Sequence, residues 1–117
     1  KNMIIIKKEI FDKNSNTTEY KTIVRNFEKG YVKELDYGEL HDVSFSFNNY
    51  FACRFNDDLI ISFDNNANFL WKMIIDRNRI LAGFQLSYDN SVLTIPYDNP
   101  EVKIILDNKT GQIISDK

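Results

Sequence analysis

Cysteine, histidine and glycine are all scarce in this chain of 117 residues, and these shortages exclude several classes of site. The single cysteine, Cys53, excludes an intrachain disulfide, and with only one histidine the sequence has no zinc-binding pattern. Four scattered glycines form no glycine-rich phosphate loop. No apolar run approaches the roughly 20 residues of a membrane-spanning helix. Met3–Ile6 is too short for the core of a signal peptide. We therefore expect a cytoplasmic protein without a membrane segment.

The composition is typical of a folded globular protein. Hydrophobic residues make up 43% of the chain and aromatic residues 14%, which is enough to build a core and too much for a disordered segment. The length fits one domain, so residues 1–117 are predicted to form a single domain.

Short apolar segments alternate with Asn-, Asp- and Gly-rich turns along the whole chain. Helical periodicity is not sustained over ten residues anywhere, and Gly30 interrupts the best helical candidate, residues 26–37. Because Asn, Asp and Gly tolerate the backbone conformations of tight reversals, the pattern predicts an all-β fold of antiparallel meanders. The expected strands cover residues 3–11, 19–24, 31–35, 42–47, 50–55, 59–63, 69–75, 84–88, 92–97, 102–106 and 112–114.

An internal repeat organises these strands. Leu59–Ile74 aligns with Val102–Lys117, so that Asp64 falls on Asp107. A fainter third copy places Phe11-Asp12 on Phe63-Asp64. One hairpin therefore recurs, in the form of an apolar strand, an aspartate, a polar turn and an apolar strand. We expect two four-stranded units, residues 42–75 and 81–115, and a partial unit at residues 1–35.

The order of strands and turns in residues 38–115 resembles the blades of WD- or quinoprotein-type β-propellers. The hairpin around Asp64 with Trp71 is similar to the outer hairpin of such blades, and Gly38 and His41 stand near their Gly-His pair. The resemblance implies an incomplete propeller of two to three blades, fewer than the four that closure requires. The alternative is an ordinary β-sandwich whose hairpins share turn chemistry.

Three predicted strands lack the alternation of apolar and polar residues that a half-solvated strand has. We expect both of their faces to be covered, as in stacked sheets. The segments are Leu59-Ile60-Ile61, Met73-Ile74-Ile75 and Ile104-Ile105-Leu106.

Candidates for catalysis are few. His41 lies beside Asp42, a pairing that could make a general base, but no nucleophile accompanies it. Cys53 lies within an apolar strand, which is typical of a buried structural thiol. Glu34 and Asp36 would share one strand face and could bind a metal or form a glycosidase pair. We expect neither catalysis nor a cofactor, and we keep a small carbohydrate- or metal-dependent hydrolase as an alternative.

Charge is distributed unevenly, although the net charge is only −2. Residues 1–33 carry eight Lys/Arg against four acids, whereas residues 34–66 carry one Arg against seven acids. The basic residues of the first segment are interleaved with aromatic ones, as in nucleic-acid-binding grooves. The acidic pI of about 5.4 argues against that use. Acids mixed with tyrosines are typical of a protein interface for a cationic partner.

A small, acidic, all-β chain with no catalytic set resembles the immunity proteins of bacterial contact-dependent growth inhibition systems. The resemblance implies a module that binds and neutralises a cognate toxin domain, often a basic nuclease, as a heterodimer. The expected partner-binding residues are Glu34, Asp36, Tyr37, Glu39, Asp42, Asp57 and Asp58. The alternative is a structural domain, a partial propeller that completes itself by forming a homodimer.

Overall fold

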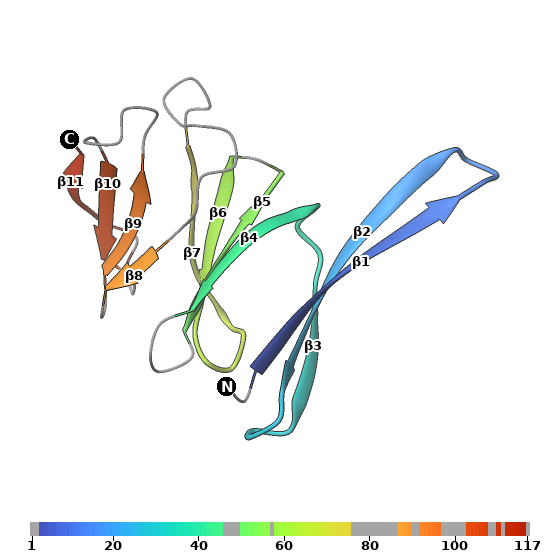
Figure 1. Cartoon of the computed structure of the whole chain (residues 1–117), viewed down its shortest axis with the longest axis horizontal. Helices are drawn as coiled ribbons and strands as arrows, with labels where there is room; N and C mark the ends of the chain where they lie inside the picture. Colours follow the sequence, from blue (N-terminus) through green and yellow to red (C-terminus); the bar gives the residue numbers. More distant parts are fainter. Residues whose placement is uncertain are drawn as a thin grey trace. The chain divides into compact units, whose positions relative to one another are not determined.

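The chain is described here by a computed structural model that covers residues 3–45, 50–56, 58–75, 87–89, 92–96, 103–107, 110 and 112–116. All regular secondary structure in these residues is β-strand (Figure 1). The strands are β1 (Met3–Asp12), β2 (Thr17–Asn26), β3 (Tyr31–Leu35), β4 (Leu40–Phe45), β5 (Phe51–Phe55), β6 (Leu59–Phe63), β7 (Phe69–Ile74), β8 (Ser87–Asp89), β9 (Val92–Pro96), β10 (Lys103–Asp107) and β11 (Ile113–Asp116).

The strands form three open antiparallel sheets in which sequence neighbours are also neighbours in space. Their orders are β1-β2-β3, β4-β5-β6-β7 and β11-β10-β9-β8. The prediction of an all-β fold built from antiparallel meanders is therefore confirmed. The chain divides into two compact units, Lys1–Leu40 and His41–Lys117, and each is considered by itself below. The resemblance to propeller blades stays a prediction.

The first sheet is dominated by the β1–β2 hairpin. Its two ten-residue strands pair over their full length, from Met3 opposite Asn26 to Asp12 opposite Thr17. The predicted strand at residues 19–24 is too short, because the backbone pairing continues through polar residues at both ends. β3 pairs with only the last five residues of β2, Thr22–Asn26. The far half of the hairpin therefore extends beyond β3 as a two-stranded ribbon (Figure 1).

The turn between β2 and β3 needs its glycine. The buried Asn26 side chain accepts a hydrogen bond from the Lys29 backbone N–H at 2.8 Å, and the Asn26 carbonyl accepts one from the Gly30 N–H at 2.9 Å. Gly30 has a φ of +74°, a left-handed conformation that costs other residues energy. The chain can then reverse into Tyr31, which pairs with Asn26.

The β4–β7 sheet contains many fully buried residues. Every residue of β5 is buried, and so are Ile60, Ile61, Ser62 and Phe63 of β6. Successive side chains of a strand point to opposite faces, so both faces of these strands are covered. Phe51 and Phe63 are direct cross-strand partners, and their rings stack with centroids 5.0 Å apart.

The prediction that both faces of the strand are covered is confirmed for β6 and is wrong for β7. Ile74 is 73% exposed, while Ile75 is buried. β7 is the last strand of its sheet, and its side chains alternate between buried and exposed positions near Trp71. The corresponding side chains of β10 lie outside the described residues.

The repeat detected in the sequence has a counterpart in the hairpin turns. The Asp64 carboxylate accepts hydrogen bonds from the Asn66 and Asn68 backbone N–H groups at 2.8 and 2.9 Å. The Asp107 carboxylate accepts one from the Thr110 N–H at 3.2 Å, and the Asp12 carboxylate accepts one from the Asn14 N–H at 2.9 Å. Each aspartate thus begins its turn by satisfying backbone donors within it.

The two clearer copies also share an irregularity in strand register. The β6–β7 pairing shifts between Ser62 and Phe63, and the β10–β11 pairing shifts between Ile105 and Leu106. These two positions are equivalent in the alignment of Leu59 with Val102. A β-bulge whose extra residue lies on the strand after the turn, Leu70 in one copy and Ile114 in the other, is therefore part of the repeated unit. The sequence also predicts turns at residues 48–49, 76–79 and 98–100, between the expected strands, and these lie outside the described residues.

Candidate partner-binding surface

The connection from β3 to β4 places an acid and an aromatic residue in an exposed bend. Asp36 and Tyr37 are exposed, and Gly38, with a φ of +112°, completes the bend. The flanking residues Leu35 and Leu40 are both buried, at 3% and 8% exposure. A short segment held between two buried leucines has little freedom to move, so Asp36 and Tyr37 are presented in a defined position.

The two glutamates beside this bend are held by lysines of the first sheet. The Glu34 carboxylate lies 2.8 Å from the Lys21 Nζ atom, which is also 3.6 Å from Glu19. The hydrogen bond and charge of Glu34, and then the charge of Glu19, raise the pKa of Lys21. The Glu39 carboxylate lies 3.4 Å from the Lys7 Nζ atom.

These contacts change the meaning of the charge asymmetry seen in the sequence. The basic first segment and the start of the acidic second segment lie in the same unit and partly neutralise each other. Among the described residues Asp36 makes no ion pair. The unneutralised negative charge of this unit near the bend is therefore that of Asp36. The same ion pairs partly neutralise the positive charges of Lys7 and Lys21, which the sequence had offered as nucleic-acid contacts.

The described site residues of the second unit are less exposed than Asp36 and Tyr37. Asp42 is half-buried in β4 and its carboxylate accepts a hydrogen bond from the Val43 N–H at 2.9 Å. Asp58 is half-buried, and its backbone carbonyl accepts a hydrogen bond from the Ile75 N–H at 2.9 Å. Asp57 lies outside the described residues. Glu34, Asp36, Tyr37 and Glu39 thus lie around one connection of the first unit, while Asp42 and Asp58 belong to the second unit.

The candidates for chemistry occupy contrasting positions. His41 is exposed in β4. Cys53 is fully buried in β5, and burial, together with the negative charge of Asp42, raises the pKa of its thiol far above the usual range. Within the described ranges no group of three His, Cys, Asp or Glu residues is arranged to hold a metal ion. The predicted shared face of Glu34 and Asp36 is not formed by β3, because that strand ends at Leu35.

One surface feature of the first unit was not anticipated from the sequence. Ile4, Ile6 and Ile10 of β1 and Val32 of β3 are all exposed, at 45%, 47%, 38% and 66%. They share a face of the sheet, because Ile4 and Val32 both pair with Arg25. The alternation of Ile4, Ile6, Lys8 and Ile10 was the available signal, but a sequence alone does not say which face of a strand is covered.

No protein-family model matches this chain, and no curated protein matches it significantly. No helix in the described residues is long and apolar enough to cross a membrane.

Proposed function

We propose that this chain is a non-catalytic protein-binding module, an immunity protein that binds and neutralises a cognate, basic toxin domain. The observation that carries the proposal is the bend at Asp36 and Tyr37. These two neighbours in sequence, an aromatic ring and a carboxylate that makes no ion pair with any described residue, are both exposed between buried leucines. Tyrosine is among the residues that contribute most to protein interfaces, because a large ring is ordered at little entropic cost.

The charge around the bend suits a cationic partner. Asp36 attracts such a partner without first losing an ion pair to a described residue. Glu34 and Glu39 already contact Lys21 and Lys7, so a partner's arginine would have to compete with these lysines. We therefore assign Asp36 and Tyr37 the main role, and assign Glu34 and Glu39 the role of a rim. Rim charges act mainly on association rates.

The test uses the protein encoded next to this chain's gene in its source genome, where the partner of an immunity protein is expected. Expression of that neighbour alone should arrest bacterial growth, and co-expression of this chain should restore it. The two purified proteins should form a heterodimer. A neighbour that is harmless, or that is toxic and neither binds this chain nor is neutralised by it, would refute the proposal.

The surface is tested separately by charge reversal. Asp36→Lys should slow association with the neighbour several-fold at low salt, and Tyr37→Ala should speed dissociation. Glu19→Lys is the matched control, because it makes the same charge change on an exposed residue of the same unit. Equal effects of Asp36→Lys and Glu19→Lys would show that only net charge matters and that the bend is not the contact.

A further inference from the structure

The outer edge of β1 is open to solvent in the described residues. β1 is the first strand in the order β1-β2-β3, and among the described strands it pairs with β2 alone. From Ile4 to Asp12 every residue except the half-buried Ile5 is exposed. An edge strand of this length presents a row of backbone donors and acceptors, which is a template for pairing with another strand.

The sequence along this edge is chemically symmetric about Lys8. Residues 5–11 read Ile-Ile-Lys-Lys-Glu-Ile-Phe. In an antiparallel pair of two such strands with the two-fold axis at Lys8, Lys7 faces Glu9 of the other copy, Ile6 faces Ile10, and Ile5 faces Phe11. Opposite charges and apolar side chains in direct cross-strand positions stabilise a sheet.

Neighbouring registers lack this complementarity. An axis at Lys7 places Ile6 against a lysine and Ile5 against a glutamate. An axis at Glu9 places both Lys7 and Lys8 against apolar side chains. Among these three registers, only the one centred on Lys8 matches charge with opposite charge and apolar with apolar where residues 5–7 face residues 9–11.

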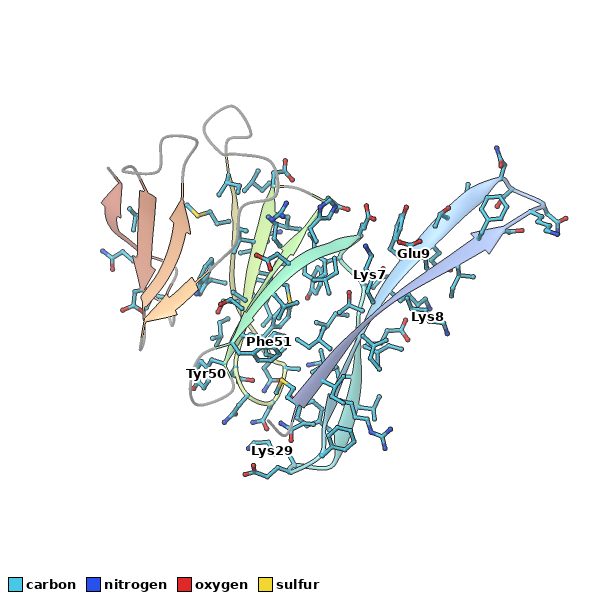
Figure 2. The ribbon with its side chains drawn as sticks, viewed as in Figure 1. Lys7, Lys8, Glu9, Lys29, Tyr50 and Phe51 are labelled. Atoms are coloured by element: carbon cyan, nitrogen blue, oxygen red, sulfur yellow. The ribbon has the colours of Figure 1, made fainter. Side chains whose placement is uncertain are left out.

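The faces of the strand are consistent with this register. Lys7 and Glu9 project from one face of β1 and Lys8 from the other, as Figure 2 shows. The Lys7 Nζ atom lies 3.7 Å from the Glu9 carboxylate of its own strand. A second copy would therefore bring two lysines and two glutamates together on one face. On the other face Ile6 and Ile10, now 47% and 38% exposed, would cover each other.

The ribbon beyond β3 supplies an independent reason for a partner. Residues 8–12 and 17–21 pair only with each other in the described sheet, since β3 pairs with β2 only from Thr22 to Asn26. A two-stranded ribbon is marginally stable in water, whereas three or more strands can be stable. Pairing of two ribbons along β1 would give each of them two further strands.

We propose that this edge binds a second copy of the chain. The two β1 strands pair antiparallel about a two-fold axis at Lys8, from Ile4 opposite Asp12 to Asp12 opposite Ile4, and the two three-stranded sheets become one of six strands. This dimer is independent of the proposed toxin-binding function. Its unfavourable contacts are Lys8 against Lys8 of the other copy, since like charges directly opposite each other are destabilising, and Ile4 against Asp12 at the two ends of the pairing.

The oligomeric state tests the interface. Sedimentation velocity of the purified chain from micromolar to several hundred micromolar should show a monomer–dimer equilibrium. Lys7→Glu and Glu9→Lys should each weaken the dimer about tenfold, because each reversal creates two repulsive pairs. The double variant Lys7→Glu/Glu9→Lys should restore it. A chain that stays monomeric throughout, or a dimer unaffected by either single reversal, would overturn the proposal.

Disulfide trapping tests the register. Residues directly opposite in an antiparallel pair have Cα atoms about 4.5–5.5 Å apart, within reach of a disulfide. Lys8→Cys should therefore cross-link two copies under mild oxidation. Ile10→Cys should not, because the two cysteines would be four residues apart along the strands, about 14 Å. The buried native Cys53 should not interfere. Cross-linking at position 10 in place of position 8 would contradict the symmetric register.

Discussion

Replacement of Asp64 by alanine tests the turn chemistry of the repeated hairpin. The Asp64 carboxylate accepts two backbone hydrogen bonds, at 2.8 and 2.9 Å, and a longer one from the Asn68 side-chain amide at 3.3 Å. A typical intramolecular hydrogen bond contributes about 1 kcal/mol net. Asp64→Ala should therefore lower the free energy of unfolding by about 2 kcal/mol.

The equivalent aspartate of the other copy provides an internal comparison. The Asp107 carboxylate accepts a backbone hydrogen bond from the Thr110 N–H, and its length of 3.2 Å is at the limit of good geometry. Because this bond is longer than either backbone bond of Asp64, Asp107→Ala should cost less stability than Asp64→Ala. Asp64→Asn is the matched control, because its amide oxygen can still accept the two backbone hydrogen bonds and should retain most of the stability.

Urea unfolding measures these differences. The only tryptophan, Trp71, is buried in β7 and follows the turn that begins at Asp64, so its fluorescence reports on the sheet that contains this turn. With a slope of about 2 kcal/mol per molar urea, Asp64→Ala should lower the midpoint by about 1 M. Far-UV circular dichroism reports on the strands as a whole and gives the comparison with Asp107→Ala. An Asp64→Ala variant no less stable than Asp107→Ala, or an Asp64→Asn variant as unstable as Asp64→Ala, would refute this account of the turn.

Three further predictions concern the core, the β2–β3 turn and the buried thiol. Phe63→Ala should destabilise the chain by about 3–5 kcal/mol, because it removes a buried ring stacked on Phe51. Ile74→Ala, at a position 73% exposed, should change stability by less than about 0.5 kcal/mol. Similar losses of stability for these two variants in urea titrations would contradict the burial assigned to Phe63 and the exposure assigned to Ile74. Gly30→Ala should lower the free energy of unfolding by about 1 kcal/mol, because the φ of +74° is strained for alanine, although a Cβ atom there would meet nothing within 4 Å. Gly30→Asn should lower it less. A Gly30→Ala variant with unchanged stability in thermal unfolding would argue against this conformation. Because burial raises the pKa of Cys53 above its ordinary value of 9.0, the unfolded chain loses the thiol proton first, so stability should be unaffected below about pH 9 and fall above it by about 1.4 kcal/mol per pH unit. In urea titrations between pH 8 and 10, the stability of Cys53→Ala should lack this additional fall with pH. An identical pH dependence of stability in the two proteins would show that the thiol ionises as readily in the folded state as in the unfolded chain.

The positions of the hairpins follow from short segments of sequence. Asp12, Asp64 and Asp107 each satisfy backbone donors within a few residues, so the turns they begin are local and could be predicted without knowledge of the rest of the chain. The ends of the strands were predicted less accurately. β2 extends to Thr17 and Asn26 because backbone pairing does not require apolar side chains at those positions.

The candidate site could be predicted only as a set of residues. The sequence placed Glu34, Asp36 and Glu39 in an acidic segment, but Lys21 lies near Glu34 only because β2 and β3 pair side by side. That contact distinguishes the neutralised Glu34 from Asp36, and the sequence treated the two as equivalent.

Burial likewise depended on the sheets and not on the hydrophobicity of a segment. Ile60 and Ile74 are the same residue type in adjacent strands with similar apolar neighbours, yet the first is fully buried and the second is 73% exposed. Turn formation depends on the backbone of a few consecutive residues, and the sequence determines it directly. The covering of a strand and the pairing of its charges depend on residues distant in the sequence, and therefore only the tertiary structure decided them.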